Sequence, residues 1–165
     1  MAILPLVTMD NPVLHQKARR VRTISDSIQK LIDDMIETMR HAEGAGLAAP
    51  QVGVPLQVVV IEAVEEDEIT LINPELVKSS GEYEVSEGCL SLPGYKGEVT
   101  RWESVTVKGR DRHGKQVRLK AGGLLAHVLQ HEIDHINGVV YIDHLESRDK
   151  LTRIQPDDED VSSHI

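Results

Sequence analysis

Residues 122–138 of the chain read GGLLAHVLQHEIDHING and predict a helix from about residue 122 to residue 137, closed by the last glycine of the stretch. Inside this helix His131 and His135 are four positions apart, so both imidazoles project from one face and can bind one metal ion. Glu132 follows the first histidine directly, where its carboxylate can reach a metal-bound water without binding the metal. The alternative is a helix whose histidines and charges are merely solvated, since the chain has 8 histidines.

The rest of the chain predicts one more helix and a series of strands. Residues 25–42 carry a single apolar stripe from Ile28 to Met39, the pattern of an amphipathic helix that faces a core. A β-branched run at 56–63 predicts a strand buried on both faces. Further strands are expected at 69–72, 75–79, 82–87, 97–100, 104–109 and 115–120, with turns at 79–81 and 113–114. This order predicts an α+β fold, with antiparallel or mixed β-sheets around a central metal-binding helix and an N-terminal amphipathic helix.

Length and composition predict one soluble domain in a reducing compartment. The 165 residues suit a single catalytic domain over 1–155, followed by an acidic tail at 156–165 that we expect to be disordered. The net charge of -9 and the 2% of aromatic residues argue against DNA or another nucleic acid as the partner. No apolar run approaches the roughly 20 residues that span a bilayer, and the N-terminus lacks the pattern of a secretory signal. A single cysteine cannot form an internal disulfide, so we expect a cytoplasmic location.

Two histidines leave the metal site incomplete, and the sequence offers two further ligands. Glu146 lies downstream, as the third ligand of a thermolysin-type peptidase would. Cys89 lies in the segment EGCLS at residues 87–91, at a strand end. A lone cysteine is commonly a small buried hydrophobic residue. A thiolate with two imidazoles would instead make a three-ligand site whose fourth position is open to water, and the metal would lower the pKa of that water.

A small-residue segment, GAGLAAPQVG at residues 44–53, lies between the first helix and the buried strand. Its small residues would let another backbone approach closely. Gln51 offers an amide NH2 group that could stabilise an oxyanion. The segment could also be only a glycine-rich connection, and its position after a helix excludes a dinucleotide-binding fingerprint.

Together, residues 44–51 (GAGLAAPQ), 87–91 (EGCLS) and 130–135 (QHEIDH) resemble the three signature motifs of the peptide deformylase family in sequence, order and spacing. The resemblance extends from the N-terminus to about residue 150. It implies an enzyme that removes the formyl group from the N-terminal methionine of new polypeptides and releases formate.

The resemblance also implies a role for each matching residue. The metal would be bound by Cys89, His131 and His135. Glu132 would be the general base and then the general acid, while Gln51 and the backbone N–H of Leu90 would donate to the oxyanion. The backbone near Gly46 would pair with the substrate as an added strand. Glu87 and Arg101 would form an ion pair that supports the Cys89 loop, although they could also be an ordinary surface pair. Gln130 and Asp134 would orient ligands.

The family's methionine pocket maps onto Val85, Leu124, His127 and Val128, with Ala45 near its mouth. His127 departs from the apolar residue usual at its position, and it forms a stripe with His131 and His135 at i, i+4 and i+8. We therefore expect His127 at the pocket wall without binding the metal. The equally weighted alternative is a solvated or core histidine.

The family resemblance, and not the type of ligand atoms, predicts which metal and which cellular partners the protein has. One sulfur and two nitrogens in tetrahedral geometry would suggest zinc, whereas the family implies one Fe(2+) per chain that zinc, nickel or cobalt can replace. The partners would be N-formylmethionyl nascent polypeptides, with transient proximity to the ribosome. A basic C-terminal helix that docks on ribosomal RNA is not expected, because the tail is acidic.

Two other classes of protein remain open on the sequence. A binding or regulatory protein could use the metal only structurally, but such a site needs neither Glu132 nor Gln51. A general metallopeptidase would use Glu146 in place of Cys89.

Overall fold

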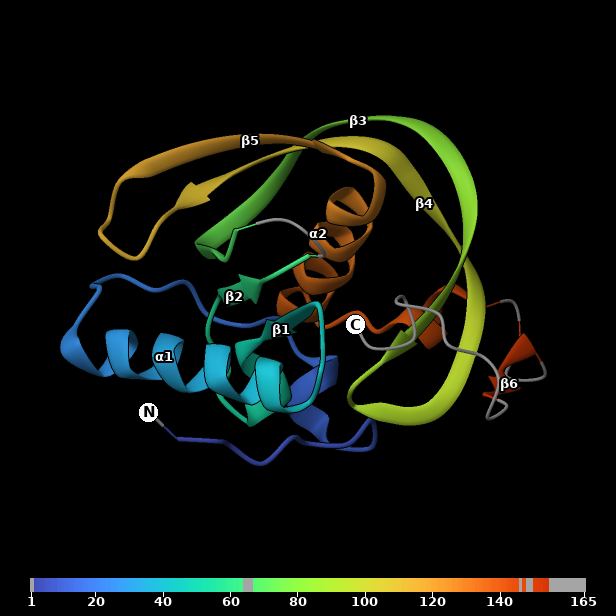
Figure 1. The fold of residues 1–165 in the computed structure, drawn as a ribbon, viewed down its shortest axis with the longest axis horizontal. Coiled ribbons are helices and arrows are strands. Elements are labelled where there is room, and N and C mark those ends of the chain that lie inside the picture. Colours follow the sequence, from blue (N-terminus) through green and yellow to red (C-terminus); the bar gives the residue numbers. More distant parts are fainter. Residues whose placement is uncertain (1, 64–66, 146, 148–149, 155–165) are drawn as a thin grey trace.

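A computed structural model describes residues 2–63, 67–145, 147 and 150–154, and it has an α+β fold with one antiparallel sheet and two α-helices (Figure 1). In chain order the elements are η1 (Pro12–His15), α1 (Asp26–His41), β1 (Gly46–Ala48), η2 (Ala49–Val52), β2 (Val58–Ile61), β3 (Ile69–Cys89), β4 (Leu92–Arg110), β5 (Gln116–Gly122), α2 (Gly123–Ile136), η3 (Tyr141–His144) and β6 (Thr152–Arg153). The predicted tail at 156–165 lies outside the described residues, as does Glu146.

The sheet runs in the order β1-β2-β3-β4-β5, and β6 adds to β4. Every pairing between named strands is antiparallel. The long strands β3 and β4 form one curved hairpin that bends around α2, as Figure 1 shows in green and yellow. The helix that carries the histidine motif therefore lies inside the curve of the sheet.

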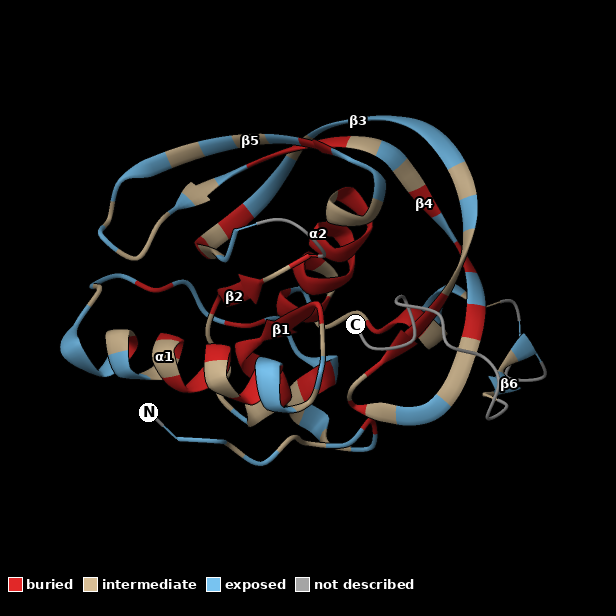
Figure 2. Cartoon of the chain, in the orientation of Figure 1, coloured by how far each residue is buried: buried red, intermediate tan, exposed pale blue. Residues whose placement is uncertain are grey.

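Strand β2 separates two apolar layers, because successive residues of a strand point to opposite faces. Val58 and Val60 pack with the residues of α1, whereas Val59 and Ile61 pack with those of α2. All four are fully buried, as expected for a strand covered on both faces, and Figure 2 shows β1, β2 and most of α2 as buried. The sheet thus has α1 on one side and α2 on the other.

Helix α1 begins and ends within one residue of the predicted range 25–42. Ser25 caps it by accepting a hydrogen bond from the backbone N–H of Ile28 at 3.4 Å. The residues of its apolar stripe are buried against β1 and β2: Ile28, Ile32, Met35, Ile36 and Met39. In the described part of the chain no helix is long and apolar enough to cross a membrane.

The strand boundaries differ from the prediction in the middle of the chain. The three strands expected at 69–72, 75–79 and 82–87 are one strand, β3, with irregular register near Pro74 and between Leu76 and Lys78. The turn predicted at 79–81 is therefore wrong. Gly81 has φ +69°, a conformation that glycine adopts at little cost. It lets the strand bend while Ser80 and Glu82 stay paired with β4.

The predicted hairpin around residues 113–114 is present, with β4 and β5 paired from Arg110 and Gln116 onward. The small-residue segment at 44–53 is more than a connection between helix and strand, because its residues Gly46–Ala48 form strand β1, which pairs with β2. β1 is the first strand of the sheet order. One of its backbone edges therefore faces away from the sheet.

We expect Met35→Ala to lower the free energy of unfolding by about 2–5 kcal/mol, because it leaves a cavity between α1 and β2. Met35 is 0% exposed in that layer. Met35→Leu conserves volume and should cost less than about 1.5 kcal/mol. Urea unfolding of the three proteins at equal metal load measures both values. Equal losses in the two variants would contradict the packing described here.

Candidate metal centre

Three potential metal ligands meet where α2 passes the end of β3. His131 and His135 lie on consecutive turns of α2, and Cys89 is the last residue of β3. One ligand atom from each residue lies within 4.8 Å of the other two, and all three side chains are buried. The helix spacing brings the two rings together, while the fold of the β3–β4 hairpin brings the sulfur to them.

Two of the three distances between these ligand atoms are close to those expected around a single tetrahedral ion. His131 Nε2 is 3.0 Å from His135 Nε2, and Cys89 Sγ is 3.4 Å from His135 Nε2. Metal–nitrogen bonds of about 2.0–2.1 Å and a metal–sulfur bond of about 2.3 Å would separate tetrahedral ligand atoms by roughly 3.3–3.6 Å. The donor set therefore fits a metal ion with small adjustments of the side chains.

Burial opposes a charge on either type of ligand. It raises the pKa of the Cys89 thiol, although hydrogen bonds from Ser91 offset part of this effect. Burial, followed by the electrostatic effect of the neighbouring His131, holds the pKa of His135 well below its ordinary value, so this ring is neutral. A neutral imidazole is ready to bind a metal, whereas the thiol needs a cation to favour its deprotonation.

His131 is oriented by a buried carboxylate. Its Nδ1 lies at hydrogen-bond distance from Glu87 Oε1. Burial raises the pKa of Glu87, but His131, His127 and Arg101 outweigh this and hold it well below its ordinary value. Because the ionised carboxylate only accepts hydrogen bonds, His131 Nδ1 must donate. The Nε2 of a neutral His131 then presents its lone pair to the metal position.

Arg101 connects Glu87 to Asp134 on α2. Its Nε and Nη2 donate to the two oxygens of Glu87 at 2.9 and 2.5 Å, and its Nη1 donates to Asp134 Oδ2 at 2.7 Å. The same Asp134 oxygen is 2.9 Å from His144 Nε2. Glu87 is 0% and Arg101 5% exposed, so the pair is buried and is not an ordinary surface pair. Gln130 connects α2 to β4 by two hydrogen bonds, because its amide accepts from the backbone N–H of Trp102 and donates to the C=O of the same residue.

Glu132 is buried beside the ligands without a hydrogen-bond partner on either carboxylate oxygen among the described residues. Its Oε1 is 4.0 Å from His131 Nε2. Burial, and then the negative charge of Glu87, raise the pKa of Glu132 well above its ordinary value. An unpaired buried carboxylate is costly and calls for an explanation. A cation and a water molecule next to it would satisfy both oxygens.

Gln51 directs its amide toward the cysteine. Its Oε1 accepts a hydrogen bond from Ala48 N at 2.9 Å, so the NH2 group faces the other way. That group is 3.5 Å from Cys89 Sγ and 3.3 Å from Ser91 Oγ. Leu90 and Ser91 form the turn between β3 and β4, directly after the cysteine. Ser91 was part of the quoted motif but had no predicted role.

Gly46 allows β1 to lie directly against α2. A Cβ atom at this position would be 2.7 Å from Val128 Cγ1 and 3.0 Å from Glu132 Cγ. Any larger residue would therefore push the strand away from the helix or displace Glu132. The close approach keeps the unpaired edge of β1 near the candidate base.

The residues predicted for a methionine pocket come from two apolar clusters of the structure. Ala45, Val128 and Leu124 pack in the apolar layer under α2, whereas Val85 packs with Cys89 and its neighbours. His127 was expected at the pocket wall, but its ring is 2% exposed and its Nε2 is 2.6 Å from Glu87 Oε2. The reason is its position one turn before His131, where it meets the second oxygen of the same carboxylate.

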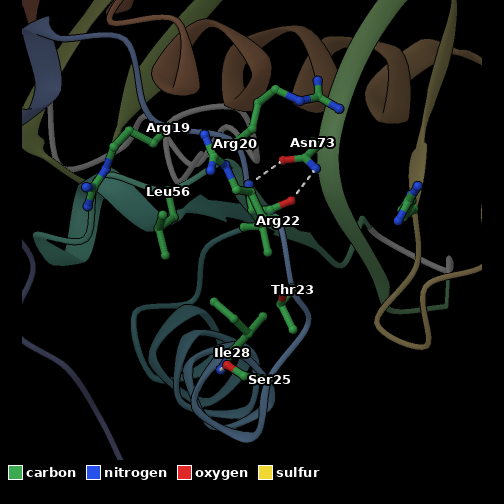
Figure 3. Close-up of a pocket in the computed structure, with 10 residues that line it drawn as sticks. Arg19, Arg20, Arg22, Thr23, Ser25, Ile28, Leu56 and Asn73 are labelled. Carbon is green, nitrogen blue, oxygen red and sulfur yellow. Dashed lines mark hydrogen bonds between the residues drawn. The ribbon is translucent and has the colours of Figure 1, made fainter.

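A separate cavity of about 920 Å³ is lined by Arg19, Arg20, Arg22 and Arg110 (Figure 3). At the wall of this cavity, the side chain of Asn73 makes two hydrogen bonds to the backbone of Val21. None of the residues that line this cavity belongs to the metal centre. Because the cavity does not contain the metal ligands, it is not the candidate active site.

Some residues of the site could not have been found by sequence reasoning. His144 and Tyr141 follow α2 in η3, with the Tyr141 ring stacked near His131 at a centroid distance of 6.5 Å. Neither belongs to a motif, so the only signal is their closeness in sequence to the histidine helix. The contact of His127 with Glu87 likewise depends on the packing of α2 against β3.

Comparisons with known proteins identify the family of the chain. The family model described as polypeptide deformylase matches residues 3–151. A peptide deformylase of Dehalococcoides mccartyi (strain CBDB1) is 58% identical over 160 residues, which cover 96% of each chain. Another, from Thermomicrobium roseum, is 47% identical over 171 residues and covers 99% of this chain and 97% of that protein.

Solved structures show the same relationship. The crystal structure of a peptide deformylase from Legionella pneumophila is 46% identical with a TM-score of 0.88, over 90% of this chain and 89% of that one. A peptide deformylase from Synechococcus elongatus, solved in complex with actinonin, is 43% identical with a TM-score of 0.85, over 89% of this chain and 81% of that one. With the family model matching most of its length, the chain belongs to the peptide deformylase family and is an enzyme.

Proposed function

We propose that this peptide deformylase removes the formyl group from N-formylmethionine at a single metal ion held by Cys89, His131 and His135. The observation that carries the proposal is Glu132, a buried carboxylate without a described partner beside three converging ligand atoms. When bound, the metal would polarise the formyl carbonyl and lower the pKa of the attacking water. Three protein ligands leave a position open for that chemistry.

Glu132 is proposed as the group that moves the proton. Its carboxylate takes a proton from the attacking water and then returns it to the α-amine as formate leaves. The raised pKa of Glu132 supports both halves of this exchange, because burial and the charge of Glu87 strengthen the base. General acid–base catalysis of this kind typically contributes about 10²–10⁴-fold to the rate.

Gln51 and Leu90 are proposed to stabilise the negative charge that develops on the formyl oxygen. The Gln51 NH2 group already faces the cysteine side of the site, and Ala48 holds the amide in that orientation. The backbone N–H of Leu90 lies in the turn directly after Cys89. Each such donor is typically worth about 3 kcal/mol.

The substrate backbone is proposed to pair with the outer edge of β1 near Gly46. Main-chain hydrogen bonds would then bind polypeptides independently of their sequence. Ala45, Val85, Leu124 and Val128 remain the proposed contacts of the methionine side chain.

The resident metal is proposed to be Fe(2+), one per chain, with zinc, nickel or cobalt able to replace it. The support is the resemblance to the family, since the donor set by itself would also suit zinc. The enzyme is proposed to be one catalytic domain over residues 1–155 in the cytoplasm. It would act on nascent polypeptides near the ribosome.

Formate release from a formyl-Met-Ala peptide tests the function. Iron-loaded protein kept anaerobic should release formate and leave the Met-Ala bond intact. A general metallopeptidase would cleave that bond, and a protein with a purely structural metal would do neither. Absence of formate from metal-loaded protein would defeat the proposal.

Cys89→Ala should remove the metal together with the activity, because two imidazoles alone bind a divalent ion weakly. We expect metal content, measured by elemental analysis after dialysis, to fall to roughly a tenth of that in the unchanged protein or less. Glu146→Gln is the matched control and should keep both metal and formate release. The reverse result would favour the metallopeptidase alternative.

Glu132→Gln keeps the shape of the side chain but removes the base. The expected result is a loss of about 10²–10⁴-fold in kcat at unchanged metal content. Glu84→Gln, a change of an exposed carboxylate on β3, should leave kcat unaltered. Full activity of metal-loaded Glu132→Gln would exclude this residue as the proton carrier.

A further inference from the structure

His127 is a buried polar group that the proposed reaction does not use. Its side chain is 2% exposed, and the described metal-binding group consists of Cys89, His131 and His135 without it. A buried imidazole needs a hydrogen-bond partner, and the one that the structure gives it is Glu87. Its position on α2, one turn before His131, places both rings against the same carboxylate.

Glu87 accepts four N–H groups in this arrangement. Oε2 lies 2.9 Å from Arg101 Nε and 2.6 Å from His127 Nε2. Oε1 lies 2.5 Å from Arg101 Nη2 and also contacts His131 Nδ1. A carboxylate offers about four lone-pair sites, so these donors fill them all. His127 is the donor that completes the set.

The contact between His127 and Glu87 does not depend on whether His127 is charged. Arg101 remains a cation, because Glu87 and Asp134 raise its pKa despite burial, and it keeps Glu87 ionised. An ionised carboxylate can only accept, so His127 Nε2 carries a proton in either the neutral or the charged ring. The contact is therefore a hydrogen bond in both protonation states of His127 while Glu87 is ionised.

We propose that His127 is a positioning residue, which acts through Glu87 to hold the ring of His131 in its ligating orientation. The inference rests on the proposed function, since it concerns the binding of the metal. Without His127, one lone pair of a fully buried carboxylate would lose its donor. Glu87 would then turn or admit water, and the Oε1 that orients His131 would move with it.

The alternative is that His127 only fills space in the interior. In that case an apolar residue of similar volume would be neutral for metal binding. Outer partners of metal ligands typically change metal affinity by about 10–100-fold when they are removed. We expect the lower end of this range, because Arg101 still holds both oxygens of Glu87.

The test compares His127→Gln, which keeps a donor near the position of Nε2, with His127→Asn, whose amide is too short to reach Glu87. Affinity for Co(II) is measured by competition with a chelator, with the thiolate-to-cobalt absorption as the signature of Cys89 ligation. We expect about a tenfold weaker affinity for Asn and less than about a threefold change for Gln. KM of the metal-saturated enzymes should stay constant.

His127→Leu and a double-mutant cycle with Glu87→Gln separate positioning from packing. If His127 acts through Glu87, its replacement by Leu should weaken cobalt binding in the natural background but add little once Glu87 is Gln. His15→Gln is the control, because His15 Nε2 also makes a hydrogen bond, to Met9 O, outside this network. Its cobalt affinity should be unchanged.

Unchanged cobalt affinity in both the Asn and the Leu variants would overturn the inference and leave the proposed function intact. Equal weakening in Gln and Asn, or additive losses in the cycle, would also overturn it. Failure of the unchanged protein to bind cobalt with a thiolate absorption would instead defeat the proposed function.

Discussion

The ionised carboxylate of Glu87, enclosed without exposure to solvent, is the constraint on which the arrangement of this site depends. A buried charge is tolerated only when hydrogen bonds and an opposite charge surround it. Here the guanidinium of Arg101 comes from β4, and the two imidazoles come from α2. The hydrogen bonds to Glu87 therefore fix the position of the ligand helix α2 relative to the β3–β4 hairpin.

The same constraint links the fold to the proposed chemistry. Glu87 lies two residues before Cys89 on β3, so the segment that accepts the N–H of His131 also carries the sulfur. A shift of this segment of β3 would therefore change the carboxylate contacts and the position of the thiol together. Glu132 lies on the other side of this arrangement, buried and without a described partner. The two glutamates thus have opposite environments, and their pKa values are displaced in opposite directions.

The apolar layers provide the rigidity that such a site needs. The fully buried β2 strand contacts α1 on one face and α2 on the other, so the ligand helix is packed on a sheet that is itself supported from behind. Close contact of Gly46 with α2 adds a second restraint next to Glu132. A site held by packed elements keeps its ligand geometry more accurately than one held by loops.

The sequence alone determined the features that depend on local spacing. The order of helix and strand patterns predicted the α+β fold, and the resemblance of the three motifs to a known family predicted the enzyme family and Cys89 as the third ligand. The four-residue interval between His131 and His135 predicted that both imidazoles share one face, and the apolar stripe predicted α1. Local spacing can do this because helix and strand periodicities place side chains without reference to the rest of the chain. Tertiary structure alone decided that residues 69–89 form one bent strand, that β1 is an edge strand and that His127 meets Glu87. Those features depend on the pairing of β3 with β4 and on the packing of α2 within their curve, and no local pattern encodes contacts between residues 40 positions apart.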